Sequence, residues 1–213
     1  MLDEFKGEKK CALLVFVQKL THFFLCLQNN CVRLILAGGL KTIFPVFMGK
    51  SISSLNAKKR RKDTLQEATL HVLSVLASLC KHLSRGSVEL QRLMLKFAEP
   101  GKIERLVELR KEFCLSLDAR IAELEGEQDE EQEIDEEEEY LARLDGGLEA
   151  VQWIDRLAAT VHREVVDLRP RLVQTFESTG LNFADVKTVL VEMAMKMADQ
   201  DELKDLVALA DGL

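Results

Sequence analysis

Apolar residues recur along much of the chain at intervals of three and four, the spacing of one face of an α-helix. The clearest stretch extends from Ile103 to Leu124, where nine positions form a stripe whose single polar member is Arg110. We find no run of alternating apolar and polar residues of the kind that predicts a half-buried strand. The pattern therefore predicts an all-α protein.

The same spacing predicts further helices on both sides of this stretch. Their caps are expected at Asp63 or Thr64, at Ser87 and at Asn182, because short polar side chains accept hydrogen bonds from the first free N–H groups of a helix. The predicted helices are Lys9–Gln28, Cys31–Ala37, Leu40–Met48, one from the cap at Asp63 or Thr64 to Leu83, one from Ser87 to Glu99, Ile103–Leu124, Leu141–Val161, Pro170–Gly180, one from Asn182 to Met197, and Leu203–Ala210. Breaks are predicted at Asn29-Asn30, at Gly38-Gly39, which suits a left-handed helix end, and at Pro100-Gly101.

Two stretches lack apolar periodicity. Gly49–Lys62 is polar and basic and is predicted to be a loop, and Gly126–Glu139, with Ile134 as its only large apolar residue, is predicted to be an acidic linker. The chain accordingly divides into an apolar N-terminal helix (1–29), a helical-repeat region (30–125), the linker (126–139) and a second helical region (140–213). Helices that cannot bury an apolar face alone favour a solenoid of stacked pairs with a repeat of about 40–47 residues. A compact bundle is the alternative.

Composition supports this reading. Of the 213 residues 47% are hydrophobic and 31% are charged, and 3 Pro and 11 Gly supply too few turns for a sandwich or barrel. The net charge of −7 is local, because the stretch from Ile121 to Glu139 holds twelve acidic residues and no basic one. We interpret this stretch as a solubilising linker in preference to a docking segment for a basic partner.

One compact basic run, Lys58, Lys59, Arg60, Arg61 and Lys62, is the candidate nuclear localisation signal. Five cations on a loop fit the acidic groove of an import receptor. A solvated loop that no receptor binds is an equally good interpretation. Direct nucleic-acid binding is not expected, because no aromatic residues alternate with the basic ones for base stacking.

The sequence carries no recognisable chemistry. The five cysteines show no C-x-x-C spacing and indicate reduced thiols, although a Cys26–Cys31 bridge stays open, and the four histidines lack metal-ligand spacing. We predict no catalytic, cofactor or metal site. No transmembrane helix is expected, since the longest unbroken apolar run is Cys11–Val17, and the acids at Asp3, Glu4 and Glu8 disfavour a signal peptide.

Four segments resemble a known family in the same order. They are Gly38–Met48 (GGLKTIFPVFM), Leu70–Leu79 (LHVLSVLASL), the pair Leu95–Glu99 and Lys102–Leu109 (LKFAE, KIERLVEL), and Glu137–Leu148 (EEEYLARLDGGL). They resemble the late armadillo repeats and C-terminal junction of the beta-catenin-like protein 1 family, whose members are nuclear and associated with splicing. The resemblance extends from about Asn30 to Met197, and Met1–Gln28 does not resemble the preceding repeat.

The resemblance implies the C-terminal portion of an armadillo-like solenoid without catalytic activity. It further implies a nuclear, spliceosome-associated scaffold whose partners are proteins of the nineteen complex, including its Myb-domain splicing factor. A cytoplasmic helical adaptor is the alternative function, and a helical enzyme has no supporting site. The protein-binding surface and the oligomeric state are not predicted.

Overall fold

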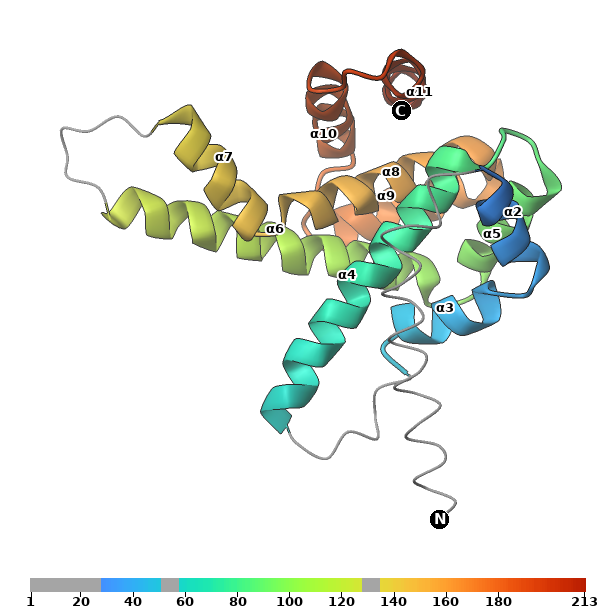
Figure 1. Ribbon diagram of the computed structural model, residues 1–213, viewed down its shortest axis with the longest axis horizontal. Coiled ribbons are helices and arrows are strands. Elements are labelled where there is room, and N and C mark those ends of the chain that lie inside the picture. Colours follow the sequence, from blue (N-terminus) through green and yellow to red (C-terminus); the bar gives the residue numbers. More distant parts are fainter. Residues whose placement is uncertain (1–27, 51–57, 128–134) are drawn as a thin grey trace. The chain divides into compact units, whose positions relative to one another are not determined.

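The computed structural model describes residues 28–50, 58–127 and 135–213, and within them all regular structure is helical (Figure 1). The predicted all-α architecture is thus confirmed for the described residues, while the predicted helix Lys9–Gln28 lies almost entirely outside them. The helices are α2 (Gln28–Leu36), α3 (Leu40–Phe47), α4 (Lys58–His82), α5 (Val88–Ala98), α6 (Lys102–Glu127), α7 (Glu136–Asp145), α8 (Leu148–Glu164), the short 3-10 helix η1 (Val166–Leu168), α9 (Arg169–Ser178), α10 (Ala184–Met195) and α11 (Gln200–Asp211).

The chain forms two compact units, Met1–Lys102 and Ile103–Leu213, called unit 1 and unit 2 below. This division differs from the expected one, which placed a boundary at the acidic segment 126–139. Helices before and after that segment belong to the same unit, because α6 contacts the α7–α8 turn and α8 through close packing and ion pairs.

Unit 1 is built around three aromatic rings. Phe44 and Phe47 of α3 and Phe97 of α5 meet edge to face, with ring centroids 5.3 to 6.0 Å apart. This geometry places the positive edge of one ring on the negative face of another. Around the rings, α2 packs on α4 and α5, and α3 packs on α4.

Several helix ends of unit 1 follow the sequence signals. Ser87 caps α5 as predicted, its hydroxyl accepting a hydrogen bond from the Leu90 N–H at 3.2 Å. The predicted left-handed end of α2 is present at Gly38. Asn29 and Asn30, by contrast, are helical residues of α2, so the predicted break between Gln28 and Cys31 is absent.

The predicted loop Gly49–Lys62 is shorter than expected. Helix α4 already begins at Lys58, so the basic run Lys58–Lys62 is helical and does not lie in a loop. Lysine and arginine are good helix formers, and they extend the helix upstream from the predicted cap at Asp63 or Thr64. Residues 51–57 lie outside the described residues.

Unit 2 is organised around α8, which contacts α7, α9, η1, α10 and α11. Eleven consecutive or nearly consecutive residues of α8 are buried, including Asp155, Arg156 and Thr160. Figure 1 shows α8 and α9 lying side by side. A helix buried on nearly all sides needs internal partners for its polar side chains, since a buried polar group without a hydrogen bond is costly.

The most deeply buried polar contact joins α6 to α8. Arg110, the one polar residue of the predicted stripe, donates from Nε to Oδ1 of Asp155 at 2.6 Å and from Nη2 to Oδ2 at 3.1 Å. The two side chains are 3% and 0% exposed. The guanidinium also lies over the ring of Phe176 in α9, with 5.4 Å from Cζ to the ring centroid. One side chain thus connects three helices.

Burial and pairing act in opposite directions on this ion pair. Burial raises the pKa of Asp155 above its ordinary value, and the hydrogen bonds and charge of Arg110 oppose that rise. Burial acts to lower the pKa of Arg110, and the hydrogen bonds and charge of Asp155 raise it above its ordinary value. The favourable state at neutral pH is therefore the doubly ionised pair.

The predicted single helix Leu141–Val161 is in fact two helices. Helix α7 ends at Asp145 and α8 begins at Leu148, because Gly147 has φ +104, a left-handed conformation that side chains with a Cβ rarely adopt. A Cβ at Gly147 would also lie 3.0 Å from Cδ1 of Phe113. The turn therefore lies directly against α6.

The acidic linker is also shorter than predicted. Gly126 and Glu127 belong to the end of α6, and Glu136–Glu139 form the first turn of α7. Four glutamates fit that turn because the positive end of the helix dipole stabilises them. Residues 128–134 lie outside the described residues.

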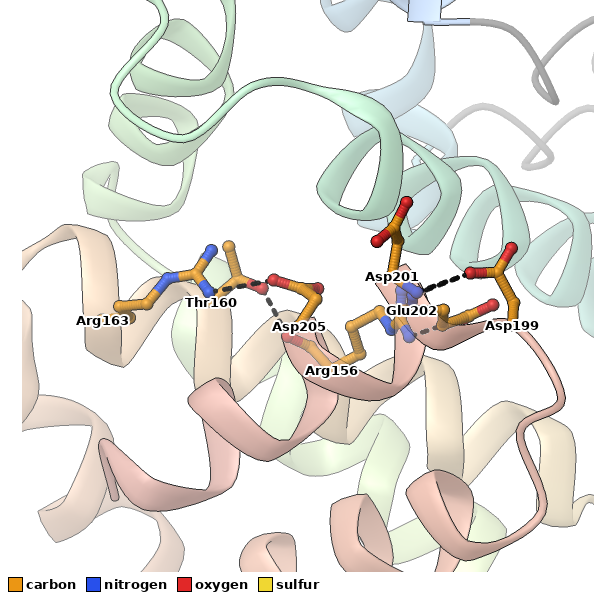
Figure 2. Close-up of polar contacts among 7 residues, drawn as sticks. All are labelled: Arg156, Thr160, Arg163, Asp199, Asp201, Glu202 and Asp205. Carbon is orange, nitrogen blue, oxygen red and sulfur yellow. Dashed lines mark hydrogen bonds and ion pairs between the residues drawn. The ribbon is translucent and has the colours of Figure 1, made fainter.

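A polar seam joins α8 to α11 (Figure 2). Arg156 pairs with Glu202 at 2.8 Å, and Arg163 pairs with Asp205 at 3.3 Å. Asp199 caps α11 by accepting from the N–H groups of Asp201 and Glu202. Two ion pairs in the same order along both helices fix the register of α11 on α8.

The buried pair Arg110–Asp155 gives a direct test of unit 2. Replacing Arg110 with Met leaves a buried carboxylate without its cation, and we expect the free energy of unfolding to fall by about 3–5 kcal/mol. The double substitution Arg110→Met/Asp155→Leu removes both charges and should restore most of the loss. Urea denaturation followed by circular dichroism measures both effects.

The matched control is Arg171→Met, which breaks the half-exposed ion pair with Glu104. It should cost less than about 1 kcal/mol. A double variant as unstable as Arg110→Met would contradict the charge-burial explanation and would assign the effect to loss of the contact between the Arg110 guanidinium and the Phe176 ring.

Candidate protein-binding groove

The segment Gly38–Met48, the first of the four resembling segments, builds one wall of a groove in unit 1. Helix α3 begins after the Gly38 turn and ends at Phe47, and the backbone N–H of Lys50 then bonds to the Pro45 carbonyl at 2.9 Å. This closure needs a left-handed residue at Gly49, which has φ +67. The turn at Gly49 therefore positions Lys50 beside the end of α3.

The groove has a volume of about 310 Å³ and combines apolar and charged side chains. Its lining residues come from α3 and the segment after it, from the end of α5, and from the first residue of α6. They are Leu40, Lys41, Phe44, Pro45, Met48, Lys50, Lys96, Glu99 and Lys102. The volume is at the lower end of the range for ligand pockets, enough for a few side chains of a partner.

The opposite wall is formed by a three-residue ion cluster. Lys96 donates to Oε1 of Glu99 at 2.6 Å, and Lys102 donates to Oε2 of the same carboxylate at 2.5 Å. The turn at Pro100-Gly101 between α5 and α6 brings Glu99 and Lys102 together. The hydrogen bonds from Lys102 and Lys96 lower the pKa of Glu99 to about 2, so Glu99 is a carboxylate throughout the physiological pH range.

Lys102 is the least exposed cation of the groove. Its side chain is 10% exposed, and its ammonium lies 5.3 Å from the centroid of the Phe44 ring. A cation over an aromatic face is attracted by the negative quadrupole of that face. The ring and Glu99 together hold the Lys102 charge in place.

The apolar side chains of the lining differ in their exposure to solvent. Leu40 and Phe44 are buried, whereas Pro45 is exposed and Met48 is half-buried. Pro45 presents a rigid ring and Met48 a flexible thioether, and methionine adapts well to irregular partner surfaces. Pro45 and Met48 therefore form the part of the lining that a partner can reach.

The candidate signal Lys58, Lys59, Arg60, Arg61 and Lys62 is not part of this groove's lining. Its backbone is the first part of α4, and its side chains lie outside the described part of the structure. The groove itself was missed by sequence reasoning. Its available signal was the spacing of Lys96, Glu99 and Lys102 across a Pro-Gly break, where residues three apart are close enough to pair.

The methionines of the segment 193–197, Trp153 and the described cysteines differ in burial. Met193 is buried, Met197 is half-buried and Met195 is exposed, so the three methionines do not form one surface. Trp153 is half-buried on α8. Cys114 is a free thiol, Cys31 and Cys80 are buried, and Cys11 and Cys26 lie outside the described residues.

Residues 28–50, 58–127 and 135–213 contain no group of three or more His, Cys, Asp or Glu side chains arranged to hold a metal ion. In the same ranges no single helix has the length and hydropathy to cross a membrane. The pair Asn29–Leu36 and Leu40–Phe47 meets those two criteria when taken together, with a bend of 86° between its helices.

In the described residues all regular structure is helical and no strand is present, which defines an all-α protein. A family model described as "Catenin-beta-like, Arm-motif containing nuclear" matches residues 1–191. The chain therefore belongs to this catenin-beta-like family, and its fold class is all-α with armadillo-like helical repeats.

Individual relatives agree with the family match. The chain is 34% identical over 181 residues to Beta-catenin-like protein 1 of Homo sapiens, covering 80% of this chain and 31% of the human protein. It is 31% identical over 201 residues to the Bos taurus protein of the same name, covering 86% and 34% of the two chains. The Beta-catenin-like protein 1 homolog of Schizosaccharomyces pombe is 38% identical over 81 residues, which are 37% of this chain and 12% of the yeast protein.

Two features of these matches bear on the sequence analysis. The chain spans about a third of the length of the mammalian relatives. The family match begins at residue 1, so it includes Met1–Gln28, which we had expected to lie outside the resemblance. A mostly apolar segment has few distinctive residues by which a resemblance to the family can be recognised.

The ion cluster of the groove predicts a measurable titration. In the intact chain the Glu99 carboxyl should titrate with a pKa of about 2. The carbon-13 NMR chemical shift of the side-chain carboxyl, recorded as a function of pH, measures this pKa. Because this pKa is depressed, the stability linked to Glu99 is present above the unfolded-state pKa of about 4.5 and is lost as the pH falls toward 2.

Removing either lysine should raise the pKa of Glu99. Lys102→Met should have the larger effect, because its hydrogen bond is the largest cause of the shift, and Lys96→Met the smaller. A Glu99 pKa near 4.5 in the unsubstituted chain would show that the lysines do not contact it in solution.

Proposed function

We propose that this chain is a non-catalytic, nuclear, protein-binding scaffold that takes part in pre-mRNA splicing. The observation that carries the proposal is the Arm-motif family match over residues 1–191, in a family described as nuclear. Helical repeats present extended surfaces to protein partners. A groove of mixed apolar and charged lining in unit 1 is consistent with such a surface.

The proposed partners are proteins of the spliceosomal nineteen complex, with its Myb-domain splicing factor as the first candidate. This assignment comes from the segments Gly38–Met48 and Glu137–Leu148, which resemble the splicing-associated family. No nucleic-acid contact, cofactor or metal is part of the proposal.

Capture from nuclear extract tests the partner assignment. The tagged chain, the full-length human relative and an unrelated helical-repeat protein of equal net charge are compared at 0.15 M and 0.5 M salt. We expect the chain to enrich the Myb-domain factor above the unrelated control at both salt concentrations, because apolar contacts resist screening. We expect less factor than the human relative retains, because the chain spans about a third of that protein.

Immunoblotting for the Myb-domain factor gives the readout. Capture by the human relative with none by this chain would overturn the proposal for this chain, because the binding determinants would then lie in parts that it lacks. Capture no greater than that by the unrelated control of equal net charge would identify a nonspecific electrostatic contact and would also count against it.

Nuclear entry is proposed to depend on Lys58–Lys62. A receptor groove grips a basic signal in extended form, so the first turns of α4 must unwind to be read. Unwinding there is favoured because five cations at a helix N-terminus oppose the helix dipole. The proposed signal forms the first turns of α4, where the helix dipole disfavours cations.

A fluorescent fusion of the full chain tests this signal. Replacing all five residues Lys58–Lys62 with Ala should lower the nuclear fraction, while replacing Lys187, Lys204 and Arg171 with Ala should leave it unchanged. Equal nuclear fractions for the first variant and the unsubstituted chain would remove the signal hypothesis and leave entry to a bound partner.

A further inference from the structure

We propose that the groove of unit 1 binds an acidic protein segment that carries one large apolar side chain. Aspartate or glutamate carboxylates of the segment pair with the groove lysines, and the apolar side chain sits on Pro45 and Met48. The inference rests on the proposed protein-binding function and adds the site and the chemistry of a partner.

The charge of the groove favours an acidic ligand. The groove lining contains four lysines and one glutamate, although the chain as a whole carries a net charge of −7. The excess of positive charge is therefore local and opposite in sign to the protein average. A partner segment rich in carboxylates is attracted to this patch, and the complementarity selects against basic segments.

The lysines also keep donor capacity. An ammonium group has three N–H donors, and Lys96 and Lys102 each use one on Glu99. Glu99 holds both ammonium groups at one wall and so reduces the side-chain entropy that binding would otherwise cost. Lys41 and Lys50 are exposed on the α3 side, so carboxylates can approach cations from both walls.

The accessible apolar side chains of the lining favour a protein segment over an RNA strand. The exposed Pro45 and half-buried Met48 offer a seat for an aliphatic or aromatic side chain. The one aromatic residue of the lining, Phe44, is 3% exposed and cannot stack with a base. The Glu99 carboxylate repels a continuous phosphate backbone, whereas a peptide can place its carboxylates on either side of it.

Synthetic peptides provide the probe. The first has a leucine flanked on each side by alternating Glu and Asp, the second has Ala in place of that leucine, and the third has Lys in place of every acid. Binding of the full chain to each fluorescent peptide is measured by anisotropy at 0.15 M salt. We expect the first to bind, the second to bind about fivefold more weakly and the third not to bind.

Charge reversal locates the site. Lys41→Glu/Lys50→Glu should weaken binding of the leucine peptide about tenfold, which corresponds to about 1.4 kcal/mol. The matched control, Lys187→Glu/Lys204→Glu, changes the net charge equally at exposed positions outside the groove and should change the affinity less than twofold. Circular dichroism confirms that both double variants keep the helical content of the parent.

A third variant tests the apolar seat. Met48→Gln keeps the length of the side chain and removes its apolar character, and it should weaken the leucine peptide but not the alanine peptide. An equal effect on both peptides would overturn the apolar seat.

Three results would overturn the proposal. Equal weakening by the groove and control variants would show nonspecific charge attraction. Tighter binding of an oligouridine than of the leucine peptide, lost in the groove variant, would assign the groove to nucleic acid. If the leucine peptide does not bind at a protein concentration of 1 mM, the groove does not bind an acidic segment of this kind.

The groove proposal and the proposed function can fail separately. If the groove variant captures the Myb-domain factor as well as the unsubstituted chain does, the scaffold function stands and the groove is not its binding site. If the chain binds the leucine peptide but captures no splicing protein, the groove stands and the splicing assignment fails.

Discussion

The arrangement of unit 2 depends on the burial of an arginine and an aspartate side by side between α6 and α8. Taking both charges out of water is costly, and their attraction offsets the cost only when the geometry is close to ideal. Arg110 and Asp155 meet that condition with two nearly parallel hydrogen bonds and an aromatic ring against the guanidinium. An apolar contact between α6 and α8 would tolerate sliding, whereas this one permits a single relative position of the two helices.

Other polar side chains of α8 also pair with neighbouring groups. Asp155 pairs with Arg110 of α6, and Arg156 and Arg163 pair with Glu202 and Asp205 of α11, although Nη1 of Arg156 is buried without a hydrogen-bond partner. The Thr160 hydroxyl donates to the Arg156 carbonyl within α8 itself. Helix α8 is consequently buried without being uniformly apolar. Its polar side chains determine which helix packs on which side, and its Leu, Ile, Val and Ala side chains supply the burial energy. Unit 1 follows a different scheme, in which a cluster of three phenylalanine rings forms the centre and the buried charge of Lys102 is held by Glu99 and the Phe44 ring.

Most of the helices could be predicted from the sequence, because periodicity reports which face of a helix is buried. The stripe from Ile103 to Leu124 and the Ser87 cap are confirmed, and Arg110 stood out as the polar member of an apolar face. Its partner could not be predicted, since Asp155 lies 45 residues away and only tertiary structure brings the two together. The Gly146-Gly147 turn was missed because the apolar spacing continues through it without interruption.

The groove was not predicted for a related reason. Its walls come from α3 and from the junction of α5 with α6, and each wall alone has the pattern of an ordinary amphipathic segment. The start of α4 was placed too late because the run of cations was interpreted as a solvated loop, although lysine and arginine are good helix formers. Local pattern therefore predicts the elements well, and it does not predict surfaces assembled from several elements.

The turn at Gly147 has a consequence for sequence variation within the family. A side chain there would need a right-handed backbone and would meet the Phe113 ring, so position 147 can accept a larger residue only if position 113 becomes smaller and the turn is rebuilt. The two positions are 34 residues apart in sequence and belong to different helical segments. They should therefore vary together among related chains, so that a homologue lacking glycine at the turn also lacks phenylalanine on α6.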